Sequence, residues 1–249
     1  ELPGQWFASA EIFVGHATLS AFIGARPDVA HMATAEISPR NLEYGLRATV
    51  PNTNGQYSLY AAQLVPQSGV VDPVASTSAA RPYQLVGLSA HRAVGAALLE
   101  VDVAYKTGLL RASAVDLSAH DRVDLAIGVE YALSNITQLN ASATVQHWLD
   151  QDTAYFDAGL AGSVPAPQTT ASYLIGVSSS GFDGNLGLSA YVGGAIDASS
   201  QFVALGVEYP VSDSLTLKAN YSRISAAPSS VLAPIDGTQN LSMSAEYFF

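Results

Sequence analysis

The sequence predicts an all-β fold: an antiparallel transmembrane β-barrel of about 13 to 14 strands, with short periplasmic turns and long outer loops. Three observations predict it. Apolar and polar residues alternate in many segments of roughly nine to twelve residues, the length of a tilted strand that crosses a bilayer. The composition is 49% hydrophobic but only 12% charged. No apolar run approaches the roughly 20 residues of a membrane-spanning helix.

The alternating segments follow one another along the whole chain. We expect strands at residues 6–14, 17–25, 41–50, 56–65, 83–90, 97–105, 122–133, 136–149, 170–179, 185–193, 201–209, 215–224 and 241–249. Short connections rich in turn-forming residues alternate with long ones, as expected for periplasmic turns and outer loops. The longest loop, residues 150–168, is the best candidate to fold inward as a constriction.

The last strand has one apolar side that ends on an aromatic residue. This side consists of Leu241, Met243, Ala245, Tyr247 and Phe249. The pattern resembles the closing strand of bacterial outer-membrane β-barrels of the porin-like kind. The resemblance implies a location in the bacterial outer membrane, and a terminal segment that the barrel-insertion machinery reads and that then closes the barrel. An edge strand of a soluble sandwich is the alternative.

A weak internal repeat supports this orientation. Residues 126–131, 204–209 and 242–247 share a pattern that ends in Glu-Tyr. The tyrosine falls on the apolar side near the expected periplasmic end, where an aromatic girdle belongs. The glutamate falls on the opposite side. We therefore expect Glu130, Glu208 and Glu246 to point into the barrel.

Strand parity bears on the domain organisation. We expect residues 1–249 to form a single barrel domain, but counting back from the end makes the first strand run downward from the outer side. Because bacterial single-chain barrels normally have an even number of strands, we expect one or more N-terminal strands to be absent. A further strand within residues 32–37 is the alternative.

A second, weaker resemblance agrees with a missing N-terminal part. Residues 83–104 and 122–149 look similar to the C-terminal half of a family of large proteobacterial outer-membrane proteins of unassigned function, often encoded beside envelope exporters. This resemblance implies a different role, a non-conducting barrel that anchors or docks a cell-envelope assembly or exporter.

The polar sides of the strands form a candidate lumen wall in which carboxylates outnumber bases. Its principal members are Glu43, Arg47, Glu100, Asp102, Lys106, Asp124, Glu130, Glu208, Lys218 and Glu246, with Glu11 and Arg92 as further members. Carboxylates around a water-filled pore concentrate cations and repel anions. The sequence thus predicts an outer-membrane channel for passive diffusion of small solutes with mild cation preference. Alternatively, these charges pair with one another and fill the interior.

Other functions find less support. The weaker alternative is a hydrolase with its site at the outer rim, formed by Asp116, His120 and Asp121. We expect no enzyme activity. The chain has no cysteine and its five histidines lack metal-ligand spacing, so we expect no metal or cofactor. A net charge of −11 argues against nucleic acid. The expected partners are outer-membrane lipid, small solutes and the insertion machinery, while a homo-oligomer or an envelope complex stays open.

Overall fold

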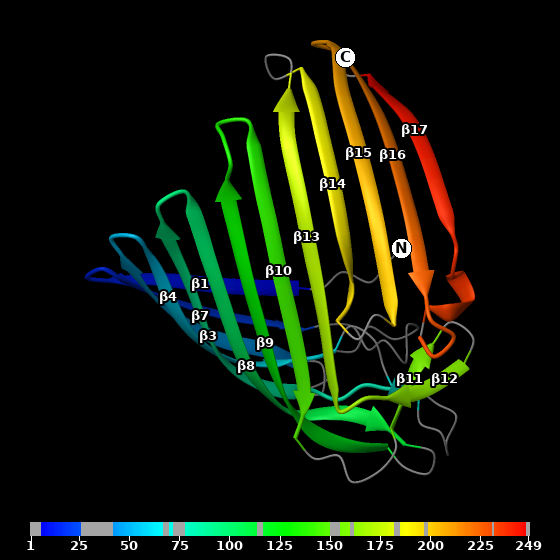
Figure 1. Ribbon diagram of the computed structural model, residues 1–249. Coiled ribbons are helices and arrows are strands. Elements are labelled where there is room, and N and C mark those ends of the chain that lie inside the picture. The colour runs from blue at the N-terminus through cyan, green and yellow to red at the C-terminus, as the bar shows by residue number, and fades with distance from the viewer. Residues whose placement is uncertain are drawn as a thin grey trace.

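The computed structural model describes residues 6–25, 42–66, 70–71, 78–113, 117–149, 155–159, 162–181, 185–196, 199–230 and 232–247. Within them, one antiparallel sheet of 13 strands dominates (Figure 1). Its strands, in spatial order, are β1 (Trp6–Val14), β2 (Ala17–Ala25), β3 (Leu42–Asn52), β4 (Gly55–Leu64), β7 (Tyr83–Val94), β8 (Ala97–Ala112), β9 (Leu117–Ala132), β10 (Thr137–Trp148), β13 (Thr169–Gly181), β14 (Leu186–Ala195), β15 (Ser200–Ser212), β16 (Leu215–Ala226) and β17 (Gln239–Tyr247).

Short and long connections lie at opposite ends of the strands. Each strand pairs antiparallel with the next one along the sheet, so the chain meanders through the sheet without a crossover. We call the end at which β1 turns into β2 the turn rim, and the opposite end, with the long connections, the loop rim. This arrangement confirms the predicted all-β antiparallel fold and the number of strands. The predicted alternation of short and long connections holds except between β8 and β9 and between β14 and β15, where only four residues connect the strands at the loop rim.

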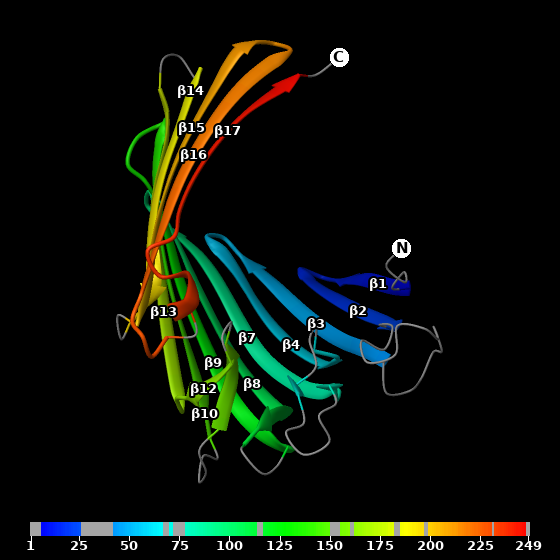
Figure 2. The same ribbon diagram turned by 90° about the vertical axis from the view of Figure 1, so that its right-hand side faces the viewer.

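The sheet is a curved wall with two edges, β1 and β17, which do not pair with each other in the described residues (Figure 2). Trp6 pairs with the end of β2, so β1 runs from the loop rim to the turn rim. Tyr247 pairs with the start of β16, so β17 runs the same way. A direct pairing of β1 with β17 would therefore be parallel. The predicted closure of the barrel is not seen among these strands.

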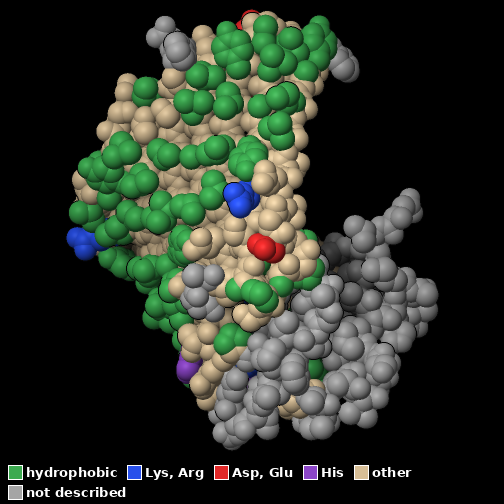
Figure 3. All heavy atoms as spheres, turned by 45° about the vertical axis from the view of Figure 1, so that its right-hand side comes forward, with side chains coloured by type: hydrophobic (Ala, Val, Ile, Leu, Met, Phe, Trp, Pro, Cys, Tyr) green, Lys and Arg blue, Asp and Glu red, His purple; other side chains and the backbone are tan. Residues whose placement is uncertain are grey.

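The wall has an apolar outer face and almost no buried core. Among the described residues, the buried hydrophobic side chains are only Ala25, Val65 and Ala104. Large apolar side chains instead lie exposed on one side of successive strands, including Leu46 at 67%, Leu88 at 59% and Met243 at 77%. Figure 3 shows hydrophobic side chains in rows over this face, with few charges among them. Such a surface suits hydrocarbon, because monomeric soluble proteins rarely expose large continuous apolar areas.

No helix in the described part of the chain is both long and apolar enough to cross a membrane.

Aromatic rings on the inner face lie against glycines of the neighbouring strand. The four directly paired positions are Phe22 with Gly45, Tyr60 with Gly87, Tyr191 with Gly176, and Phe202 with Gly193. A Cβ atom added to any of these glycines would come within 2.6 Å of the opposite ring. The glycines thus let large rings lie flat on the wall instead of projecting into the enclosed space.

Strands β8 and β9 extend beyond the lengths that the sequence predicted. Residues 107–120 were expected to form a connection, but β8 continues to Ala112 and β9 begins at Leu117. The pairing shifts between Lys106 and Leu109, where Gly108 has a φ of 81°. This irregularity interrupts the alternation, so the extension could not be read as a continued strand.

Smaller elements occupy the long connections. They are the hairpins β5 (Val70–Val71) with β6 (Ser78–Ala79) and β11 (Tyr155–Gly159) with β12 (Gly162–Ala166), and the short 3-10 helix η2 (Ala233–Ile235). The β11–β12 hairpin lies against β8 at the loop rim. The alternative strand within residues 32–37 lies outside the described residues.

Candidate functional site: the polar inner wall

The strand register places most predicted lumen residues on one inner face. On β8, Glu100 and Asp102 pair with the small residues Gly128 and Ala126 of β9, opposite in side to the exposed Val101 and Val103. The same face carries Lys106, Asp124, Glu130, Glu208, Lys218 and Glu246, and on the N-terminal strands Glu11, Glu43 and Arg47. The inner face is therefore polar, as the alternation predicted.

One residue of the predicted wall lies on the other face, and a second lies on the inner face but is buried. Arg92 pairs with Leu99, which is exposed on the outer face, so Arg92 lies on the apolar side next to the turn rim and not in the wall. There its charge can reach the polar boundary of a membrane. Glu43 faces inward but is only 5% exposed, and its Oε1 accepts the backbone N–H of Val65 at 2.9 Å. Its carboxylate is held by backbone at the loop rim.

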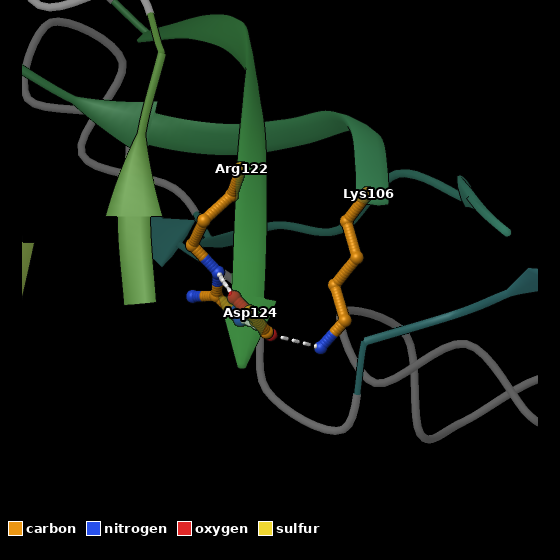
Figure 4. A network of polar contacts seen from close by, with 3 residues as sticks. All are labelled: Lys106, Arg122 and Asp124. Atoms are coloured by element: carbon orange, nitrogen blue, oxygen red, sulfur yellow. Dashed lines mark hydrogen bonds and ion pairs between the residues drawn. The ribbon is translucent and has the colours of Figure 1, made fainter. Parts of the chain in front are cut away.

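A cluster of two bases around one carboxylate lies on the inner face toward the loop rim. Lys106 Nζ lies 2.5 Å from Asp124 Oδ2. Arg122 Nε lies 2.6 Å from Asp124 Oδ1, and its Nη2 donates to Oδ2 at 2.9 Å. Figure 4 shows both cations meeting the single carboxylate. Because Lys106 and Arg122 are cross-strand partners, Asp124 screens two like charges that would otherwise repel.

Trp148 links this cluster to a second arginine. Trp148 pairs with Arg122 across β9 and β10, and the guanidinium of Arg122 lies 5.1 Å from the centre of its ring. The guanidinium of Arg111 lies over the same ring at 4.4 Å. Cations over an indole face are stabilised by its quadrupole. The Trp148 ring on β10 therefore helps to hold the charged side chains of Arg111 on β8 and Arg122 on β9 in fixed positions.

Carboxylates predominate on the inner face toward the turn rim. Lys218 Nζ lies 2.9 Å from Glu246 Oε2 and 3.8 Å from Glu208 Oε2. Gln138 Nε2 donates to Glu130 Oε2 at 3.0 Å. Glu130, Gln138, Glu208 and Lys218 line a hollow of about 800 Å³ with several serines and glycines. One cation against three carboxylates leaves this part of the wall negative.

The repeated Glu-Tyr pairs lie close to the turn rim, with the two side chains of each pair on opposite faces of the sheet. Tyr131, Tyr209 and Tyr247 are on the outer face close to the turn rim and are 42%, 47% and 66% exposed. Their neighbouring glutamates lie on the inner face. The four members of the predicted closing strand that the structure describes, Leu241, Met243, Ala245 and Tyr247, line the outer side of β17, whereas Phe249 lies outside the described residues.

Of the residues considered for a rim-site hydrolase, His120 and Asp121 lie on opposite faces of β9. His120 is on the inner face, where its Nε2 is 2.8 Å from Ser118 Oγ. Asp121 is on the outer side, where its carboxylate accepts the Tyr105 hydroxyl and the Gly108 N–H. Asp116 lies outside the described residues. In the described part of the chain, no group of three or more His, Asp or Glu side chains is arranged to hold a metal ion.

Several inner-wall residues could not be singled out from the sequence. Arg122, Arg111 and Trp148 owe their role to the pairing of β8, β9 and β10, which the alternation alone does not reveal. The rings of Tyr60 and Tyr191 were likewise missed, although each lies directly across from a glycine. A search for aromatic and glycine residues at matching register would have found the last two.

Comparisons with known proteins give a consistent but distant likeness. No family model matches the sequence, and no curated protein matches it. Among solved structures, an anion-selective porin from Comamonas acidovorans aligns with a TM-score of 0.49 at 9% identity, over 97% of this chain and 85% of the porin. The outer-membrane channel DcaP of Acinetobacter baumannii aligns with a TM-score of 0.48 at 12% identity, over 98% of this chain and 84% of DcaP.

Proposed function

We propose that the chain forms most of the wall of a passive channel for small solutes in the bacterial outer membrane. The observation that carries the proposal is the two-faced wall: one continuous antiparallel sheet with an apolar outer face and a polar inner face. An antiparallel sheet that closes into a barrel satisfies all its backbone groups and is one of only two structures that can cross hydrocarbon. The nine to 16 residues per strand suffice to span a bilayer when tilted.

The number of strands supports an open interior. A barrel of about eight strands is filled by its own side chains, whereas 16 to 18 strands enclose an aqueous channel. Thirteen strands already exceed the filled size. The flat aromatic–glycine pairs keep four large rings close to the wall. Solutes would then pass by diffusion through water, without an energy source or cofactor.

We further propose a mild cation preference that arises toward the turn rim. Glu130, Glu208 and Glu246 face the interior there with Lys218 as the cation among them. Near the loop rim, Asp124 offsets only part of the positive charge of Lys106, Arg122 and Arg111, but carboxylates outnumber bases over the inner face as a whole. The net field inside a narrow pore therefore favours cations.

We also propose that the complete barrel contains an odd number of further strands between β17 and β1. Both edge strands run from the loop rim to the turn rim, so an antiparallel closure needs a strand of opposite direction between them. Free edges in lipid would leave a row of unpaired backbone groups, at a cost of several kcal/mol for each. The intact mass of the native protein tests this: a mass that equals residues 1–249 alone would contradict strands from a preceding segment.

Conductance across a planar lipid bilayer tests the channel directly. Purified, folded protein should produce discrete current steps whose size is proportional to the voltage at low voltage. In a salt gradient, the reversal potential should have the sign of a cation-selective pore. A folded protein that inserts but never conducts would refute the channel and favour a barrel that docks an envelope assembly. Steps with an anion-selective reversal potential would refute only the cation preference.

A further inference from the structure

Arg111 occupies the inner face only because of the irregular pairing in β8. Up to Lys106, even-numbered residues of β8 face inward. After the shift at Gly108, Leu109 pairs with His120 and Arg111 pairs with Ser118, so odd-numbered residues face inward instead. Gly108 accepts the required positive φ of 81° without strain. This change of side is what turns the guanidinium of Arg111 toward the interior.

On the inner face, the Arg111 side chain is buried and connects β8 with the end of β10 and the end of the β11–β12 hairpin. Its residue is 4% exposed. Its guanidinium lies over the Trp148 ring at the end of β10, and its Nη2 donates to the carbonyl oxygen of Pro167 at 3.1 Å. Pro167 directly follows β12, so this bond joins β8 to the returning end of the β11–β12 hairpin. A hydrogen bond from a charged donor is stronger than one between neutral groups.

The same hairpin is tied at its base and along its first strand. The N–H of Trp148 donates to Gln168 O at 2.9 Å, and Gln168 Nε2 donates to Trp148 O at 3.1 Å. These bonds bring together the two ends of the segment between β10 and β13. Strand β11 lies against β8 beyond them. Arg111 is thus placed between the base of the hairpin and the strand on which the hairpin rests.

We propose that Arg111 is the positioning residue that holds the β11–β12 hairpin against the inner side of β8 and so sets the free width at the loop-rim end of the channel. The role as a width determinant rests on the proposed channel function, whereas the anchoring itself does not. The irregularity at Gly108 is necessary for this role, since a regular strand would turn the Arg111 side chain to the outside.

The test compares the unchanged protein with Arg111→Ala and Arg111→Lys, and with Arg223→Ala as a matched control. Arg223 is an exposed arginine near the loop-rim end of β16, on the outer side. Folded protein in detergent is treated with chymotrypsin, and cleavage within residues 149–168 is followed by mass spectrometry. This segment contains Tyr155 and Phe156 as cleavage sites. Cleavage after the exposed Leu133, in the turn between β9 and β10, serves as an internal reference.

Arg111→Ala should accelerate cleavage within residues 149–168 about tenfold, the effect of losing one hydrogen bond to a charged group. The reference cleavage and the Arg223→Ala variant should be unchanged. Arg111→Lys should fall between, because an ammonium can still donate to Pro167 O but cannot lie flat over Trp148. Cleavage of Arg111→Ala at the rate of the unchanged protein would overturn the anchoring. If Arg111→Ala does not fold, Arg111→Lys decides in the same way.

Single-channel recording tests the width-setting role of Arg111 separately from its role as an anchor of the hairpin. If the hairpin narrows the channel, Arg111→Ala should raise the open-state current noise and admit larger polyethylene glycols, whereas Arg223→Ala should leave both unchanged. Faster cleavage with unaltered currents would refute the width-setting role and keep the anchor. Absence of current in every variant, the unchanged protein included, would refute the channel while the cleavage result still decides the anchor.

Discussion

Gly176→Ala tests whether the aromatic–glycine pairs of the inner face hold the wall together. Gly176 on β13 lies directly across from Tyr191 on β14. An added Cβ would lie 2.3 Å from Cδ1 and 2.5 Å from Cε1 of the tyrosine ring, so the ring or the backbone must move. Overpacking of this kind costs about 1–3 kcal/mol. Alanine otherwise favours a strand over glycine by roughly 0.5–1 kcal/mol. We expect a net loss of about 1–2 kcal/mol.

Gly128→Ala is the matched control on the same face. At this position the nearest atoms to an added Cβ belong to Glu100, at 3.5 and 3.6 Å, which is ordinary contact. Without overpacking, only the conformational gain remains, so this variant should be more stable by about 0.5 kcal/mol. In a Tyr191→Ala background, Gly176→Ala should also lose its cost because the ring is gone.

The assay is urea unfolding of protein refolded into lipid vesicles, followed by the fluorescence of the two tryptophans. The midpoint should fall for Gly176→Ala and stay or rise for Gly128→Ala. An equal or higher midpoint for Gly176→Ala than for Gly128→Ala would refute the packing of the ring on the glycine.

Two further predictions concern the charges of the inner wall. The double variant Glu130→Gln and Glu208→Gln should lower the cation-to-anion permeability ratio by about twofold or more, since a unit charge a few ångströms away across water contributes roughly 1 kcal/mol. The reversal potential in a salt gradient measures it, with Asp213→Asn in the β15–β16 turn as control; unchanged selectivity would exclude these carboxylates from the ion path. Asp124→Asn should destabilise the barrel by about 1.5–3 kcal/mol, because Lys106 and Arg122 lose their shared counter-charge. The urea midpoint measures this loss, and a variant as stable as the parent would show that the cluster contributes nothing.

The alternation of the sequence predicts the sheet because lipid and water impose a strict two-residue period on a membrane-spanning strand. Val207 and Glu208, or Leu217 and Lys218, are assigned to opposite faces correctly by parity alone. Parity also correctly gave β1 and β17 the same direction. These features depend only on local side-chain direction, which does not require knowledge of the neighbouring strand.

Features that depend on pairing could not be predicted in the same way. The position of Arg111 requires the irregularity at Gly108, and Leu109 and Leu110 are both apolar, so the sequence gives no sign of the change of side. The grouping of Arg122 with Asp124 and Lys106 depends on the register of β8 against β9. Polar character predicts the inner face for Arg92, and this prediction is wrong because a long cation near the rim tolerates the outer face.

The orientation of the two faces is tested most directly by the response of single labels to lipid. The chain contains no cysteine, so each introduced cysteine is unique. A fluorophore at Val207→Cys or Leu217→Cys should be quenched strongly by brominated lipid chains and weakly by iodide. The neighbouring Glu208→Cys and Lys218→Cys should show the reverse. Equal quenching of both sets, or lipid quenching of positions 208 and 218, would contradict a wall whose apolar side faces hydrocarbon.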